Sequence, residues 1–171
     1  MRRSLPPAAE IQRAAAALLE EAGQIEDAIG LLAEAEDWPS LARLIRQQAS
    51  ALLAGGRGQT LLEWIARLPD GLKSSDPWLL YWHGAATLPL SPGKARPAFE
   101  RAFERFREGR EAAGAFLAWA AIVDTYIHEC RDLRLLDRWI VLLGDLRREF
   151  PEFPSADVEA RVVACMLPAL Y

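Results

Sequence analysis

Few residues of this chain are of the types that catalyse reactions or bind metals. It has two histidines, His83 and His128, and two cysteines, Cys130 and Cys165. His128, Glu129 and Cys130 are consecutive, and neighbouring residues of a helix point in different directions, so they cannot meet at one atom. The histidines and cysteines do not have the spacing of a zinc site. We therefore expect no metal, no cofactor and no catalytic residue, and we do not expect an enzyme.

The motifs that hold phosphate groups or DNA are also missing. There is no GxxxxGK(S/T) loop, so we expect no ATP hydrolysis, and no helix-turn-helix pattern stands out. The formal net charge of -4 gives no electrostatic reason to expect binding to nucleic acid or to anionic lipid. One charged run has alternating signs, as on a solvated helix face with pairs three and four residues apart. It comprises Arg96, Glu100, Arg101, Glu104, Arg105, Arg107, Glu108, Arg110 and Glu111.

Two features bear on the cellular location. The first residues, MRRSLPP, are basic but are not followed by the apolar stretch of a signal peptide, and no apolar run approaches the ~18 residues that span a membrane. The two cysteines are far apart in the sequence, as expected for reduced thiols. We expect a cytoplasmic protein that does not contact membranes.

The elements that must position any functional residues are all predicted to be helices. Hydrophobic residues make up 51% of the chain, and the commonest residue types are good helix formers. Apolar residues recur at helical spacing between breaks such as Gly23, Asp76-Pro77 and Ser91-Pro92. Nine helices are predicted, over about residues 8–22, 25–37, 39–54, 59–68, 77–88, 92–109, 110–130, 133–150 and 155–171.

A spacing pattern recurs in the second helix of each predicted pair. A first residue is followed four positions later by an apolar residue, and three positions after that by another. The instances are Ala28-Leu32-Ala35, Arg57-Leu61-Trp64, Ala95-Phe99-Ala102 and Trp139-Leu143-Leu146. Positions three and four apart share one face, so the stripe lets each helix pack against its partner. Pro69 and Pro151 follow two of the instances.

This pattern resembles the second half of the tetratricopeptide repeat, although its intervals are irregular. The resemblance implies an all-α fold, a right-handed superhelical array of antiparallel helical hairpins, formed as a single domain over residues 1–171.

A second resemblance covers the stretch from Asp27 to Leu80. Its segments follow one another in the order found in the helical region of MalT-type transcriptional regulators, which are LuxR-family signal-transduction ATPases. The matching segments are Asp27-Ala28-Ile29, Asp37-Trp38, Leu61-Leu62-Glu63-Trp64-Ile65, Leu68-Pro69 and Pro77-Trp78-Leu79-Leu80. The resemblance implies a ligand- or protein-binding sensor module that is a fragment or relative of a longer regulator. In that family the ATPase and DNA-binding parts lie elsewhere in the chain.

The repeat register predicts which residues face inward. First helices line the concave side of such an array. The inward positions, and thus the expected binding residues, are Arg46, Trp78, Tyr81, Asp124, His128 and Arg131. Aromatic and charged groups in one groove suit a sugar, another polar ligand or a peptide, so the expected partner is a protein or a small-molecule inducer. Trp64 and Trp139 fall on the repeat stripe and are expected in the core.

An alternative function stays open, because the same fold serves free-standing tetratricopeptide scaffolds that bind proteins without any link to transcription. The full-length gene would separate the two: an ATPase module upstream or a helix-turn-helix downstream would favour the sensor. The last predicted helix also carries an apolar stripe with no charged residue after Arg161. We expect self-association, or contact with further repeats, through Val158, Val162, Val163, Met166, Leu167 and Leu170.

Overall fold

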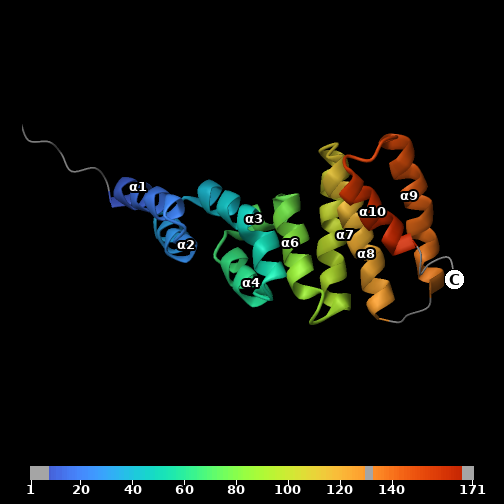
Figure 1. The fold of residues 1–171 in the computed structure, drawn as a ribbon, viewed down its shortest axis with the longest axis horizontal. Coiled ribbons are helices and arrows are strands. Elements are labelled where there is room, and N and C mark those ends of the chain that lie inside the picture. Colours follow the sequence, from blue (N-terminus) through green and yellow to red (C-terminus); the bar gives the residue numbers. More distant parts are fainter. Residues whose placement is uncertain (1–7, 130–132, 167–171) are drawn as a thin grey trace, which may run out of the picture. The chain divides into compact units, whose positions relative to one another are not determined.

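The computed structural model describes residues 8–129 and 133–166. Within these ranges every regular element is helical: there are ten α-helices, one 3-10 helix and no strand (Figure 1). The all-α prediction is thereby confirmed. None of the helices in the described ranges is long and apolar enough to cross a membrane.

The chain divides into two compact units, Met1–Lys73 and Ser74–Tyr171. The first unit contains four helices, α1 (Ala8–Glu21), α2 (Ile25–Glu34), α3 (Trp38–Ala54) and α4 (Gly58–Ala66), and a fifth, α5 (Asp70–Ser75), ends just past it. The second contains α6 (Pro77–Thr87), α7 (Pro92–Glu108), α8 (Ala112–His128), the 3-10 helix η1 (Leu133–Leu136), α9 (Asp137–Glu149) and α10 (Ala156–Met166).

Local signals set most helix limits. Asp76 accepts hydrogen bonds from the backbone N–H groups of Trp78 (2.9 Å) and Leu79 (3.1 Å), and so caps α6, which begins at Pro77 as predicted. Gly23 follows α1 with φ +75°, a conformation that glycine adopts without strain. Ser91, in contrast, makes no side-chain cap bond, although Ser91-Pro92 repeats the same sequence signal.

One helix of the structure was not expected, and one expected helix has a different start. The link after Pro69 holds α5, which the sequence analysis did not predict; the Pro69 carbonyl accepts hydrogen bonds from the Leu72 and Lys73 amides at 3.0 and 3.1 Å. The helix predicted over residues 133–150 begins as η1 and becomes α-helical only at Asp137.

The repeat stripe forms much of each core. In the first unit, α2 packs on α1 and on α3, and α3 packs on α4. Ala28, Leu32, Leu61 and Trp64 of the stripe are buried there, and Glu20 holds Arg43 through two hydrogen bonds of 2.7 and 2.8 Å that join α1 to α3. The predicted core position of Trp64 is confirmed.

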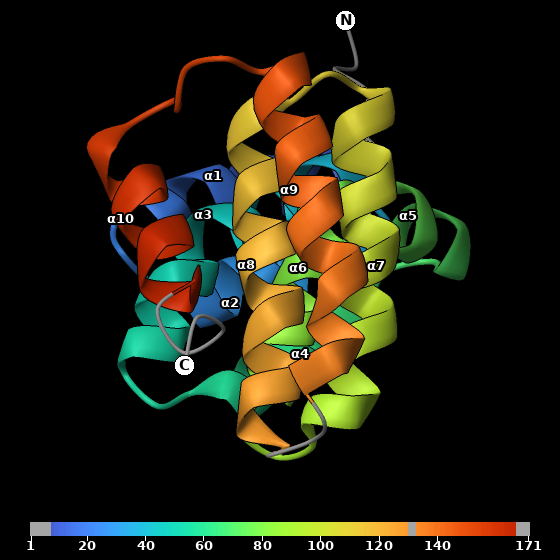
Figure 2. The ribbon, with the colours of Figure 1, turned by 90° about the vertical axis from the view of Figure 1, so that its right-hand side faces the viewer.

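In the second unit α7 packs on α6 and α8, and α9 and α10 both pack on α8 (Figure 2). The stripe residues Ala95, Phe99 and Ala102 are buried, as is Trp139. The indole of Trp119 donates a 2.7 Å hydrogen bond to the carbonyl oxygen of Trp139, which joins α8 to α9. The core position predicted for Trp139 is also confirmed.

Two glycines let the helices of the second unit approach closely. A Cβ atom at Gly84 of α6 would lie 2.8 Å from the ring of Phe99, and one at Gly114 of α8 would lie 2.3 Å from the ring of Phe106. Both contacts are shorter than atoms tolerate, so the α6–α7 and α7–α8 spacings depend on these residues lacking a side chain.

The charged run of α7 is only partly the solvated face that was expected. Arg105 pairs with Glu108 three residues on, as predicted. Arg96 instead reaches α8, where it donates to Thr125 Oγ1 at 2.7 Å, pairs with Glu129 and lies 3.7 Å from the centre of the Tyr126 ring. Arg96 is not part of the solvated face because α8 packs against this end of α7, a tertiary contact that the sequence pattern does not show.

The stripe of α10 is partly covered within the chain. Val158 and Val162 are buried together with Cys165, and α10 packs on α8. Val163 remains half exposed. Leu167 and Leu170 lie outside the described residues. The apolar surface expected to drive self-association through this helix is thus smaller than the sequence indicates.

Candidate functional site

The structure distributes the six expected binding residues unevenly. Trp78 and Tyr81 lie on α6, and Asp124 and His128 lie on α8, all in the second unit. Arg46 is exposed on α3 of the first unit. Arg131 lies outside the described residues. The predicted residues that the structure places in one unit therefore lie on α6 and α8, and Asp124 is the one among them that connects to a further helix.

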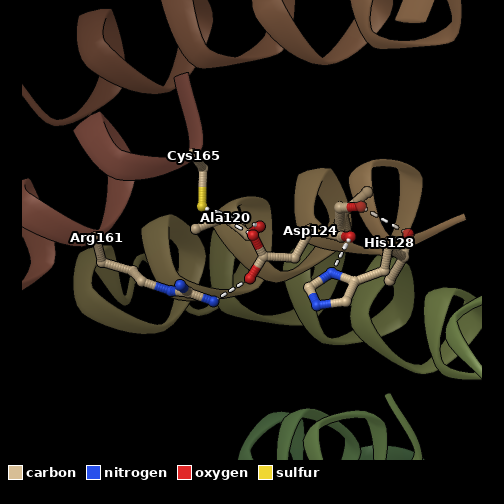
Figure 3. A network of polar contacts seen from close by, with 7 residues as sticks. Ala120, Asp124, His128, Arg161 and Cys165 are labelled. Carbon is tan, nitrogen blue, oxygen red and sulfur yellow. Dashed lines mark hydrogen bonds and ion pairs between the residues drawn. The ribbon is translucent and has the colours of Figure 1, made fainter. Parts of the chain in front are cut away.

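Asp124 joins α8 to α10. Its side chain is only 13% exposed and forms an ion pair with Arg161 of α10. The Cys165 thiol donates to Asp124 Oδ1 at 3.2 Å, and its sulfur also lies 3.6 Å from the carbonyl oxygen of Ala120 (Figure 3). One carboxylate thus accepts hydrogen bonds from two side chains that lie one turn apart on α10.

His128 lies one turn beyond Asp124, in the last turn of α8. Its Nδ1 atom is 2.8 Å from the backbone carbonyl oxygen of Asp124 (Figure 3). Because a carbonyl only accepts, Nδ1 carries the proton in this contact. The imidazole is exposed.

Tyr81 provides the aromatic side of the site. Its ring packs against those of Trp82 and Trp78, at centroid distances of 5.0 and 5.7 Å. Burial raises the pKa of the Tyr81 phenol, the charge of Arg161 lowers it, and that of Asp124 raises it. The phenol is protonated at neutral pH, so it can donate a hydrogen bond.

Trp78 is engaged in packing. Its Nε1–H donates to Glu111 Oε1 at 2.9 Å, and its ring lies 4.9 Å from that of Phe106. A ligand at this position would meet the edge of a fixed aromatic cluster. Trp78 therefore supports Tyr81, and its polar atom is already satisfied by the chain.

The Cys165 thiol of this network is held in its protonated form. Burial, followed by the neighbouring Asp124 charge, raises the pKa of the Cys165 thiol to about 12. At neutral pH roughly one thiol in 10⁵ would be a thiolate, which is the nucleophilic form. Among the residues that the structure describes, no group of three or more histidine, cysteine, aspartate or glutamate side chains could hold a metal ion.

Two residues of the network, Arg161 and Cys165, were not predicted. They are four residues apart and share a face of α10, just as Asp124 and His128 share a face of α8. This spacing is visible in the sequence. The pairing of the two faces is not visible, because it depends on α10 packing against α8.

A second place for a ligand is a hollow of about 350 Å³ in the first unit. Its lining includes Trp64, Gln48 and the ion pair of Glu26 with Arg57. Its lining mixes both charge signs with amides and one aromatic ring.

Neither a family model nor a curated protein nor a solved structure matches this chain.

Proposed function

We propose that this chain is a non-catalytic binding module, the sensor-side part of a regulator that resembles the MalT type. Its ligand or partner would contact the face that carries Tyr81, Asp124, His128 and Arg161. In this proposal the helical pairs stack as tetratricopeptide-type hairpins, whose first helices α6, α8 and α10 contribute these residues. The observation that carries the proposal is the Asp124 network at the junction of α8 and α10.

The network stands out from its surroundings. Asp124 is the one carboxylate on α8, His128 is its one basic residue, and ten residues of this helix are buried. Removing a carboxylate from water at this position costs free energy, and its attraction to Arg161 does no more than offset that cost. An apolar side chain of similar volume would give the fold similar stability. A role in recognition accounts for a polar group that packing does not require.

The groups around Asp124 indicate which ligands would fit. Arg161 and the Tyr81 hydroxyl are donors, the His128 imidazole offers its Nε2 atom as an acceptor whenever the ring is neutral, and the Tyr81 ring offers an apolar edge. A polar ligand with both acceptors and donors, or a peptide segment, matches this set. The high pKa of Cys165 supports binding without covalent chemistry.

The test is a binding screen of sugars, nucleotides and peptides, followed by tryptophan fluorescence. Trp78 lies against Tyr81, so a ligand at this face would change its emission. With the ligand found, Asp124→Asn and His128→Ala should each weaken binding by about tenfold or more, equivalent to about 1.4 kcal/mol. Glu104→Gln, an exposed change on α7, is the matched control and should leave the affinity unchanged.

Equal affinity of the wild type and of both site variants would contradict the proposed site. A ligand whose affinity depends on Gln48 or Trp64 instead would assign binding to the hollow of the first unit. The scaffold alternative, a repeat protein unconnected with transcription, would be favoured by a full-length gene with neither an ATPase module nor a DNA-binding domain.

A further inference from the structure

The outward face of α9 carries apolar side chains that the described part of the chain does not cover. Val141 is 64% exposed and Ile140 is 37% exposed, and Leu135 of η1 is 50% exposed just before them. Figure 2 shows α9 in front of α8, with no labelled helix over its near side. Large exposed apolar residues that gather on one element indicate a contact surface.

Gly144 lies on the same face, one turn after Ile140 and Val141. Its backbone is helical, and a Cβ atom there would meet only the end of the Arg148 side chain, at 4.0 Å. Neither the backbone nor the packing of this chain therefore requires a glycine. A glycine inside a helix destabilises it relative to alanine, and its usual advantage is to let another surface approach closely.

Charged residues of opposite sign, Asp137 and Arg148, lie on either side of Val141 and Gly144 on this face. Asp137, Val141, Gly144 and Arg148 are separated by four, three and four residues, so they form one stripe along the helix. A two-fold axis between Val141 and Gly144 would place Asp137 of one copy opposite Arg148 of the other. The same rotation places Val141 opposite Gly144. The two ion pairs would bracket the centre, about 16 Å apart along the helix.

Asp137 and Arg148 make no strong ion pair within the described part of the chain. Arg148 pairs with Asp145 at 3.1 Å, but the Arg148 side chain is largely exposed, so the pair contributes little and can exchange. Asp137 makes no ion pair with any residue that the structure describes. Both ends of the stripe are thus available to a second copy.

We propose that α9 is the interface of a homodimer in which two copies of this chain pack their α9 helices antiparallel. Such an interface is isologous, because the same patch serves both copies. One helix pair buries less area than the 1,200 Å² or so of a standard stable complex, so the association is weak and depends on concentration. The proposal is independent of the ligand site on α6, α8 and α10.

The test is sedimentation velocity of the whole chain from about 5 to about 500 µM, because a weak dimer forms only with rising concentration. The wild type should shift from monomer to dimer. Asp137→Arg and Arg148→Asp should each weaken the dimer by tenfold or more, and the double variant D137R/R148D should restore it. Val141→Glu should abolish it. Leu18→Glu, at a comparably exposed apolar residue of α1, is the control and should not change it.

Gly144→Ala adds a readout that separates association from folding. It should raise the melting temperature of the monomer, because alanine favours a helix, and it should weaken the dimer by filling the contact. A wild type that stays monomeric at all concentrations would overturn the proposal. So would a double variant that fails to restore the dimer, or a dimer that Val163→Glu on α10 abolishes and Val141→Glu does not.

Discussion

At the scale of single residues, Asp124 is the most informative position of the molecule. It links α10 to α8 through an ion pair and a thiol hydrogen bond, and it does so from an otherwise apolar helix. Removing the carboxylate takes an acceptor from both Arg161 and Cys165 at a largely buried position. The energetic effect is therefore larger than that of an exposed pair.

Asp124→Ala should lower the free energy of unfolding by about 1–3 kcal/mol, since Arg161 loses its acceptor on α8 and Cys165 loses one of its two acceptors there. Asp145→Ala is the matched control, because it removes an exposed pair with Arg148 and should cost less than about 0.5 kcal/mol. Urea denaturation followed by circular dichroism measures both. Similar losses for the two variants would show that Asp124 is not a structural junction.

Cys165 makes the stability depend on alkaline pH. Its pKa rises from the usual value of 9.0 to about 12 in the folded chain, chiefly because burial disfavours the thiolate. The unfolded chain therefore loses this proton first. The contribution is fully present below about pH 9 and declines as the pH rises towards 12, by at most about 1.4 kcal/mol per pH unit.

The measurement is urea denaturation at pH 8, 9 and 10 for the wild type and for Cys165→Ser. Serine does not titrate in this range, so the variant should lose part of the decline. The difference between the two chains isolates Cys165 from Tyr81, whose own pKa is also raised by burial. Parallel declines in both would contradict the assignment to the thiol.

At the scale of elements, the distance between α7 and α8 depends on Gly114. A Cβ atom there would come within 2.3 Å of Phe106, so Gly114→Ala forces either the ring or the helix to move and should cost about 1–3 kcal/mol. Gly30→Ala in α2 is the control, because a Cβ atom there meets nothing within 4 Å and alanine should stabilise the helix by up to about 1 kcal/mol. Thermal denaturation should move in opposite directions for the two variants.

The same scale shows what the sequence can and cannot predict. The limits of α1, α3 and α6 follow from Gly23, from Asp37-Trp38-Pro39 and from Asp76-Pro77, which act within a few residues. The six-residue α5 is too short to show a periodic pattern. At the candidate site, Asp124 and His128 could be selected by spacing, but their connection to Arg161 and Cys165 could not, because it depends on α10 packing against α8.

At the scale of the whole molecule, each of the two units has a buried core of its own. Leu41 of α3 and Phe99 of α7 are both fully buried, one in each unit. Truncating a buried leucine or phenylalanine to alanine costs about 2–5 kcal/mol. The loss of stability should increase local opening first in the unit that carries the substitution, because local opening depends on local packing.

Leu41→Ala should therefore raise amide hydrogen exchange across α2, α3 and α4, and leave α7 and α8 unchanged. Phe99→Ala should do the reverse. Mass spectrometry of peptic peptides resolves the two units. If each variant increased exchange equally in both units, the chain would unfold as one cooperative body and the division would have no energetic meaning.

The buried Cys165 thiol, at the junction of α8 and α10, also lets the opening of this junction be measured as a rate of chemical modification. A reagent that alkylates cysteines reaches Cys165 only when α10 lifts from Asp124 and Ala120. If reclosing is faster than labelling, each 1.4 kcal/mol of opening free energy slows modification tenfold. Comparing that rate with the rate of global unfolding would show whether the last helix detaches alone or only when the rest of its unit unfolds.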